Sequence, residues 1–157
     1  NLTDGEIREL GERKESFYRK LYRPHLKTMN GLVPFLEKAK ELGISMAVAT
    51  AAGNQNIQFI LEGLKIKSFF DAIVGAEDIQ KGKPDPEIFL KSAQRLQVSP
   101  EDCLVFEDSR FGIEAANRAG MKAVLLTTSL QPEDLGAQPA LMLAVKDFAD
   151  HNIQTVL

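Results

Sequence analysis

Apolar positions along this chain follow two spacings in turn, one helical and one extended. Apolar residues three or four positions apart, often with a glycine beyond the last of them, predict helices, here over residues 5–22, 32–42, 54–61, 86–96 and 112–119 and in a short segment at the C-terminus. Short runs that are apolar throughout predict strands buried on both faces, here at 44–49, 72–74, 103–106, 123–126 and 141–145. Strands that alternate with helices in this order predict an α/β fold with a doubly wound parallel sheet.

The N-terminal segment has a different character from the rest. Residues 5–22 are dense in Glu, Arg and Lys, and their apolar residues recur at a helical spacing that predicts one or two amphipathic helices. Pro24 then interrupts the pattern, and residues 25–30 are typical of a linker. We therefore expect two units, 1–27 and 28–157.

Composition and charge narrow the function classes. The 157 residues are 44% apolar and 26% charged, as expected of a globular domain with a real core. The net charge is -3, and basic and acidic residues are interleaved, so we expect neither nucleic acid nor a membrane surface as a partner. Without an apolar stretch of roughly 18 residues or a signal-peptide pattern, we expect a cytoplasmic protein. The single cysteine, Cys103, is expected to be a buried structural thiol.

Polar side chains stand where the predicted strands end. Thr50 follows the strand 44–49, Lys83 lies in the loop after the second strand, and Glu107 and Asp108 directly follow the third. In parallel α/β sheets, ligands bind beside the carboxyl ends of the strands. We therefore expect these four side chains to meet at one edge.

The residues around Thr50 are suited to holding an anion. A hydroxyl and the unpaired N–H groups of the turn 51–54, at the start of a helix, would accept a phosphoryl group. Alternatively, Thr50 merely ends a strand and Asn54 caps the helix. Lys83 lies in a loop stiffened by two prolines, where its ammonium could neutralise phosphate oxygens. The alternative for Lys83 is a solvated loop lysine, the role that we assign to Lys81.

Glu107 and Asp108 are adjacent carboxylates after a buried strand. They repel each other and lose hydration unless a cation or hydrogen-bond donors offset their charge. Ligands that offer only oxygen favour Mg²⁺. The structural alternative is that Asp108 and Ser109 cap the next helix.

Two runs of sequence stand out: 82–86, Gly-Lys-Pro-Asp-Pro, and 107–121, which begins Glu-Asp-Ser-Arg-Phe-Gly. They closely resemble the haloacid dehalogenase superfamily, in its branch of β-phosphoglucomutase-like phosphatases and mutases. The resemblance implies a Rossmann-like core in which Thr50 and Lys83 are catalytic residues that contact the phosphate, while Asp108 and Glu107 surround Mg²⁺. It also implies an attacking aspartate on a first strand, and no segment before Thr50 supplies that nucleophile or its strand.

The resemblance also assigns the N-terminal segment. Residues 1–27 are similar to the second half of a helical cap, with Arg13 and Lys14 facing substrate, and residues 28–157 to the core. Ala51 and Asn54 are then substrate-binding positions, whereas Ala52 and Gly53 stand where mutases tend to have a serine and a lysine.

These observations together predict a phosphatase or phosphomutase that depends on Mg²⁺ and acts on a small phosphorylated metabolite, with a sugar phosphate as the expected class. The missing strand should lie between those ending at Ala49 and Phe106, so we expect a longer, monomeric parent protein and no activity from residues 1–157 alone. The alternative is a non-catalytic fragment or pseudoenzyme that binds a partner or phosphate. A receiver-type binding domain fits poorly, because its acidic cluster would lie early in the chain.

Overall fold

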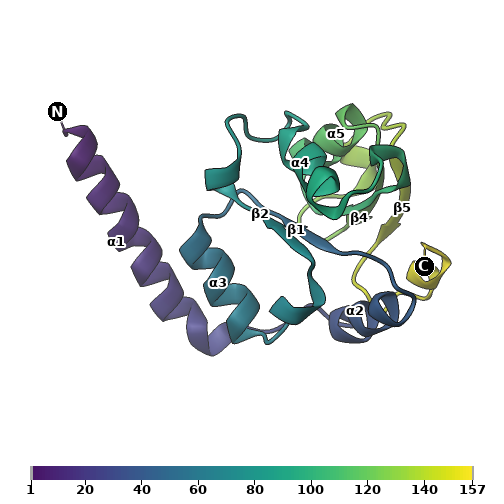
Figure 1. Cartoon of the computed structure of the whole chain (residues 1–157), viewed down its shortest axis with the longest axis horizontal. Helices are drawn as coiled ribbons and strands as arrows, with labels where there is room; N and C mark the ends of the chain where they lie inside the picture. Colours follow the sequence, from purple (N-terminus) through teal and green to yellow (C-terminus); the bar gives the residue numbers. More distant parts are fainter. Residues whose placement is uncertain (1, 157) are drawn as a thin grey trace.

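The computed structural model of the chain describes residues 2–156. It has an α/β body and a long N-terminal helix, α1 (Asp4–Tyr22), that extends away from the body as an arm and lies beside α3 at its C-terminal end (Figure 1). The other α-helices are α2 (Leu32–Glu41), α3 (Asn54–Gly63), α4 (Glu87–Leu96) and α5 (Arg110–Arg118). Their bounds agree with the sequence prediction to within about two residues, the uncertainty usual for helix ends.

Local signals account for the bounds of α1. The Thr3 hydroxyl oxygen accepts the Glu6 N–H at 3.3 Å, and the Glu6 carboxylate accepts the Thr3 N–H at 2.7 Å, which is a capping box. At the other end, Pro24 lies in a short 3₁₀ turn, Arg23–His25. The predicted amphipathic segment is therefore one continuous helix of 19 residues.

The strands are all parallel to their partners, but they form two sheets. Strands β1 (Ala47–Ala49) and β2 (Ala72–Val74) make one sheet, with Ala47 opposite Ala72. The second sheet has the order β3-β4-β5, with bounds Leu104–Glu107, Lys122–Leu126 and Leu141–Val145. The α/β class and the parallel direction are confirmed, and within residues 2–156 no ladder joins β1 to β3.

Strand β1 is shorter than predicted. Its sequence suggested a start at Ile44, but Ile44 and Ser45 are exposed and lie outside the ladder. The N–H of Met46 instead donates to the Asp71 carboxylate at 2.9 Å. The predicted C-terminal helix is a 3₁₀ segment, His151–Val156.

Three apolar clusters hold the body together. The largest packs α4 and α5 on the strands, and its fully buried residues include Val74, Ile88, Ile113 and Leu125. A second joins α2 to β3 and to the chain after β5 through three aromatic rings whose centroids lie 5.0–5.3 Å apart, those of Phe35, Phe106 and Phe148. The third packs α2 against α3.

Gly31 lets the C-terminal segment approach the start of α2. Its φ of +75° is in the left-handed region, and a Cβ atom there would lie 2.4 Å from the backbone nitrogen of Ala149. Nearby, the N–H of Phe148 donates to the carbonyl of Asn30 at 3.0 Å. Only glycine satisfies both the backbone angle and the close contact.

Within residues 2–156, every helix is too short or too polar to cross a bilayer.

We expect truncation of a buried isoleucine to cost more stability than truncation of an exposed one. Ile113→Ala removes a side chain that is 0% exposed, whereas Ile7→Ala removes one that is 55% exposed on α1. The first should lower the free energy of unfolding by about 2–5 kcal/mol and the second by less than about 0.5 kcal/mol. Urea unfolding followed by circular dichroism measures both. Equal losses would show that the assigned core is wrong.

We expect the Cys103 thiol to react slowly. It is half-buried, and burial raises its pKa above the usual range, as does the neighbouring Asp102 carboxylate to a smaller extent. Since the thiolate is the reactive form, the folded chain should react with Ellman's reagent at about pH 8 several-fold more slowly than the unfolded chain. The rate should keep rising with pH beyond the range in which the unfolded chain levels off. Equal rates would contradict the burial of this thiol.

Candidate functional site

Thr50 lies directly after β1, where the chain turns toward α3. Its N–H donates to the carbonyl of Val74 at 3.0 Å, which extends the β1–β2 ladder, and its hydroxyl oxygen accepts the N–H of Ala52 at 3.2 Å. The side chain is half-buried. The hydroxyl therefore stabilises the turn and still has a proton to donate to a ligand.

The start of α3 is occupied by a carboxylate that the sequence analysis missed. Glu77 Oε1 accepts the N–H of Asn54 at 3.0 Å, and a Cβ atom on Gly53 would lie 3.1 Å from the same oxygen. A carboxylate at a helix N-terminus is stabilised by the unpaired N–H groups and by the helix dipole. Glu77 thus takes a position that we expected for phosphate. Its sequence signal is an acidic residue soon after β2.

The alternative role of Asn54 as a helix cap is wrong. Gly53 is the capping residue and has no side chain to accept a capping hydrogen bond, and Asn54 is the first residue of the helix. Both Ala51 and Asn54 are exposed.

Lys83 is paired with Glu107 and is not a solvated loop lysine. The Lys83 ammonium donates to Glu107 Oε1, with the two side chains 16% and 8% exposed. The same ammonium lies 4.8 Å from the centre of the Phe89 ring, a cation–π contact. Lys81, by contrast, is exposed, as expected. The loop therefore directs one of its two lysines inward and leaves the other in solvent.

Glu107 is the best-connected polar residue of the site. Its Oε2 accepts the N–H of Asp108 at 3.0 Å and both the N–H and the hydroxyl of Ser109, at 3.1 and 3.0 Å. With Lys83 on Oε1, every oxygen of this buried carboxylate has a donor, which offsets its lost hydration.

The start of α5 also depends on the Glu107 carboxylate. Ser109 caps the helix by accepting the N–H of Gly112 at 3.0 Å. A Cβ atom on Gly112 would lie 2.0 Å from the carboxyl carbon of Glu107, so only glycine allows this approach. The structural alternative is therefore right for Ser109, while Asp108 does not cap the helix.

Asp108 is the exposed member of the acidic pair. Its Oδ2 accepts the hydroxyl of Thr128, beyond β4, at 3.3 Å. Within residues 2–156, no three His, Cys, Asp or Glu side chains gather into a metal site. Asp108 and Glu107 offer only carboxylate oxygens, the donors that suit Mg²⁺, which keeps several waters and shares its remaining positions with phosphate. The pair fits part of a magnesium site.

A cavity of about 390 Å³ lies between α1 and α3 and reaches Thr50. Lys14 and Tyr18 line it from α1, and Asn56 and several apolar residues line its other wall. Asn56 donates to the Glu15 carboxylate at 2.6 Å, so α1 is held on α3 by polar contacts.

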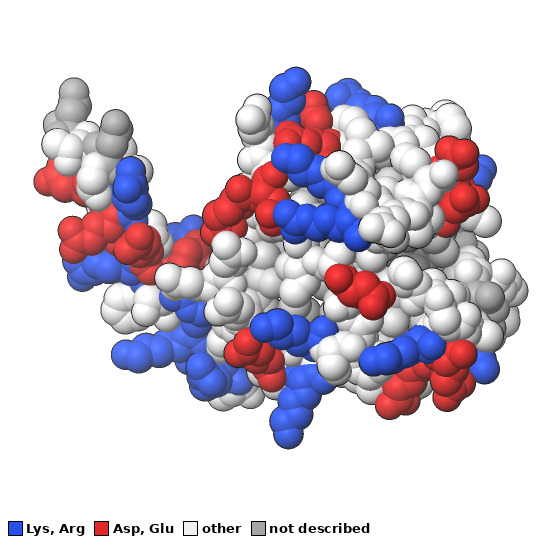
Figure 2. Space-filling model, viewed as in Figure 1, with Lys and Arg blue, Asp and Glu red and all other residues white. Residues whose placement is uncertain are grey.

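Of Arg13 and Lys14, the two residues of α1 that we expected to face substrate, one lines this cavity. Lys14 lines it, while Arg13 is exposed and is not among its lining residues. A hydrogen bond from Lys14 lowers the pKa of Glu15, and the same contact raises the pKa of Lys14. Figure 2 shows acidic and basic side chains interleaved along α1 and over this face of the body.

The contacts thus join three of the predicted residues directly, while Thr50 has other partners. Lys83, Glu107 and Asp108 form one cluster at the end of β3. Thr50 contacts the end of β2 and borders the α1–α3 cavity instead. Glu77 and Ser109 are the polar residues that the sequence analysis did not assign to a site.

Known proteins that are similar to this chain include phosphatases. The chain is 33% identical over 132 residues to the chloroplast 5-amino-6-(5-phospho-D-ribitylamino)uracil phosphatase of Arabidopsis thaliana, with 84% of this chain and 35% of that protein aligned. It is 37% identical over 106 residues to a phosphorylated carbohydrates phosphatase of Thermotoga maritima, with 68% of this chain and 49% of that protein aligned. The chain thus spans between a third and a half of these relatives.

A similar structure is the crystal structure of β-phosphoglucomutase from Clostridium difficile. It superposes with a TM-score of 0.84 at 28% identity and covers 99% of this chain and 67% of that one. The family model of haloacid dehalogenase-like hydrolases matches residues 3–126, which include both α1 and the Lys83–Glu107–Asp108 cluster. The chain therefore belongs to the haloacid dehalogenase-like hydrolase family, in the branch similar to β-phosphoglucomutase.

Proposed function

We propose that this chain is part of a Mg²⁺-dependent phosphatase or phosphomutase for a small phosphorylated metabolite, with a sugar phosphate as the substrate class. The observation that carries the proposal is the cluster at the end of β3, where the inward-pointing Lys83 ammonium meets Glu107 beside the exposed Asp108. A cation and acidic groups held at a strand end suit the binding of phosphate with a metal ion. The phosphatases among its relatives support the same reaction class.

Each residue has a role in this proposal. The Thr50 hydroxyl donates to a phosphoryl oxygen, and Lys83 neutralises the charge that spreads over the phosphoryl oxygens in the transition state. Asp108 and Glu107 would hold Mg²⁺, which supplies further positive charge to the phosphate when bound. Lys83 exchanges part of its contact with Glu107 for the phosphate.

The nucleophile in this proposal is an aspartate outside residues 1–157, on a strand between β1 and β3. Two features support it: among residues 2–156 no ladder joins β1 to β3, and the relatives are longer than this chain. A strand in that place would pair the facing edges of both sheets. Residues 1–157 would then bind phosphate without forming a phosphoaspartate.

We also propose that residues 1–27 are half of a cap over the core, with Lys14 facing the substrate, and that Ala51, Asn54 and Arg13 contact it when the cap is complete. The cavity between α1 and α3, which Lys14 and Thr50 both line, supports this division. The full-length protein is proposed to be a cytoplasmic monomer that binds no nucleic acid.

A second candidate is a non-catalytic protein that binds phosphate or a partner. The ion pair between Lys83 and Glu107 favours it, because the ammonium occupies Oε1 and competes with a metal ion for that oxygen.

Turnover separates the two candidates. Residues 1–157 should not hydrolyse p-nitrophenyl phosphate with MgCl₂, while the chain joined to its natural upstream segment should. In the joined protein, Asp108→Asn should lower kcat by about 100-fold or more, because asparagine lacks the negative charge with which Asp108 would hold Mg²⁺ beside the phosphate. The control is Glu101→Gln, an exposed acid in the turn Pro100–Asp102. No turnover by the joined protein would favour the non-catalytic candidate, and phosphoaspartate on residues 1–157 would refute an outside nucleophile.

Phosphate binding tests Lys83 without turnover. Lys83→Met should weaken the binding of inorganic phosphate to the chain by about tenfold, since it removes a charged donor worth about 1.5 kcal/mol. Lys81→Met, in the same loop but in solvent, is the matched control and should leave the affinity unchanged. Phosphorus NMR titration measures both. Equal effects of the two variants would rule out a specific role for Lys83.

A further inference from the structure

The loop that carries Lys83 has little regular structure of its own. Between the 3₁₀ turn Ala76–Asp78 and the start of α4 at Glu87, it forms no helix or strand. Yet Lys83 is 16% exposed and meets a single carboxylate. Some other contact must hold the loop in the conformation that directs this side chain inward.

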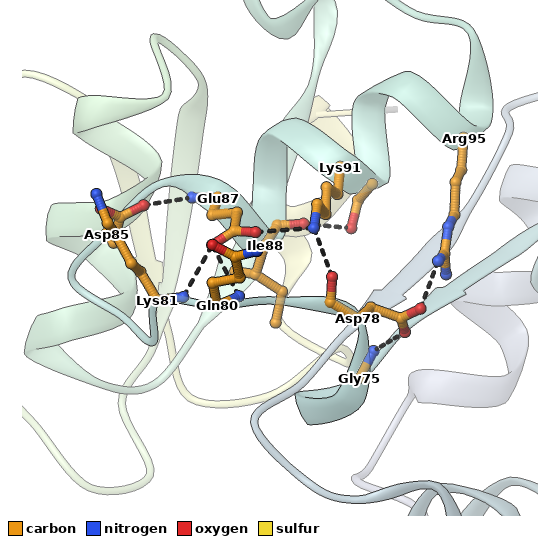
Figure 3. A network of polar contacts seen from close by, with 10 residues as sticks. Gly75, Asp78, Gln80, Lys81, Asp85, Glu87, Ile88, Lys91 and Arg95 are labelled. Atoms are coloured by element: carbon orange, nitrogen blue, oxygen red, sulfur yellow. Dashed lines mark hydrogen bonds and ion pairs between the residues drawn. The ribbon is translucent and has the colours of Figure 1, made fainter.

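One face of α4 provides that contact. Glu87, Lys91 and Arg95 are spaced four residues apart, so their side chains lie along the same face of the helix. Glu87 points toward the loop, and Lys91 and Arg95 point toward Asp78 in the turn before it (Figure 3). One acid followed by two bases at this spacing suggests an ordinary solvated row of charges. The contacts show that this row also binds the backbone.

Glu87 binds the loop on both sides of Lys83. Its Oε2 accepts the N–H groups of Gln80 and Lys81, at 3.0 and 2.8 Å, and its own N–H donates to the Asp85 carboxylate at 3.0 Å. The loop on either side of Lys83 is therefore fixed to one residue at the start of α4. A carboxylate that accepts two backbone N–H groups holds them more strongly than a neutral acceptor does.

Lys91 and Arg95 hold the turn Ala76–Asp78, which leads into the loop. Lys91 contacts Glu87 Oε1 at 2.8 Å and donates to the Asp78 carbonyl at 2.5 Å. Arg95 pairs with the Asp78 carboxylate, whose other oxygen accepts the N–H of Gly75 at 2.8 Å. These contacts lower the pKa of Glu87, mainly through Lys91, and that of Asp78, mainly through Arg95.

An ion pair on another helix can be compared with the pair of Glu87 and Lys91. Glu114 and Arg118 on α5 form an ion pair at the same spacing. Such exposed pairs contribute only about 0.3–0.5 kcal/mol to a helix. Glu87 makes an ion pair of the same kind and also receives two loop N–H groups.

We propose that Glu87 is a positioning residue for Lys83: by binding the N–H groups of residues 80 and 81 and donating to Asp85, it sets where the Lys83 ammonium lies relative to Glu107. The inference that this serves phosphoryl transfer rests on the function proposed above. The placement of Lys83 itself does not.

The experiment measures the exposure of Lys83 directly. The full chain is labelled with limiting acetic anhydride, and acetylation of each lysine is quantified by peptide mass spectrometry. Glu87→Ala should raise the labelling rate of Lys83 by about three- to tenfold, the effect of losing one or two hydrogen bonds to a charged group, while the exposed Lys122 is unchanged. Glu87→Gln should restore most of the protection, because its amide oxygen still accepts both N–H groups.

Controls separate positioning from general stability. Glu114→Ala breaks an equivalent ion pair without a loop contact and should leave Lys83 labelling unchanged. If Glu87→Ala does not fold by circular dichroism, Glu87→Met serves instead, because it keeps the length of the side chain but has no oxygen to accept the two N–H groups, and it should raise Lys83 labelling more than Glu114→Ala does.

Two outcomes would overturn the inference: wild-type labelling of Lys83 in the Glu87→Ala variant (or, where that variant does not fold, in Glu87→Met), or an equal rise in Glu114→Ala. A parallel titration with inorganic phosphate distinguishes this failure from that of the proposed function. If wild-type chain fails to bind phosphate while Glu87→Ala exposes Lys83, the positioning role stands and the phosphate role of Lys83 falls.

Discussion

The buried carboxylate of Glu107 is the interaction on which the site and part of the fold depend. It is 8% exposed, bonded to Lys83 on one oxygen and to three donors of residues 108 and 109 on the other. An unpaired carboxylate at this depth would cost several kcal/mol in lost hydration. The Lys83 loop, the end of β3 and the capped start of α5 are therefore held together by one charge.

The division of the strands into two sheets is the other constraint on function. The cluster around Lys83 belongs to the second sheet, while Thr50 extends the ladder of the first. Helix α4 packs beside both sheets, and its first residue, Glu87, binds the backbone of the Lys83 loop. The relative placement of the two halves of the site thus depends on helix packing, because no ladder links β1 to β3 among the described residues.

Several carboxylates near the candidate site accept hydrogen bonds from backbone N–H groups. Glu77 binds the start of α3, Asp78 binds Gly75, Glu87 binds the Lys83 loop and Glu107 binds the turn into α5. Each acid follows a strand or begins a helix, where N–H groups lack partners. The acidic residues near the candidate site therefore support its loops, whether or not they also bind the proposed metal, and of Glu107 and Asp108 only Asp108 is exposed.

The amino-acid sequence by itself determined most of the helices, the succession of the strands along the chain, their parallel direction and the end of the first helix before Pro24, because apolar spacing and prolines are local signals. It also indicated Lys83, Glu107 and Asp108 as candidates, because they stand near strand ends. Only the tertiary structure decided that Ser109 rather than Asp108 caps α5, that Glu77 occupies the start of α3, and that Lys83 points inward while Lys81 does not. These outcomes depend on which donors and acceptors from distant segments meet, as Glu77 meets Asn54 across 23 positions and Lys83 meets Glu107 across 24. Local spacing carries no information about such pairs, since the partner of a buried polar group is chosen by packing.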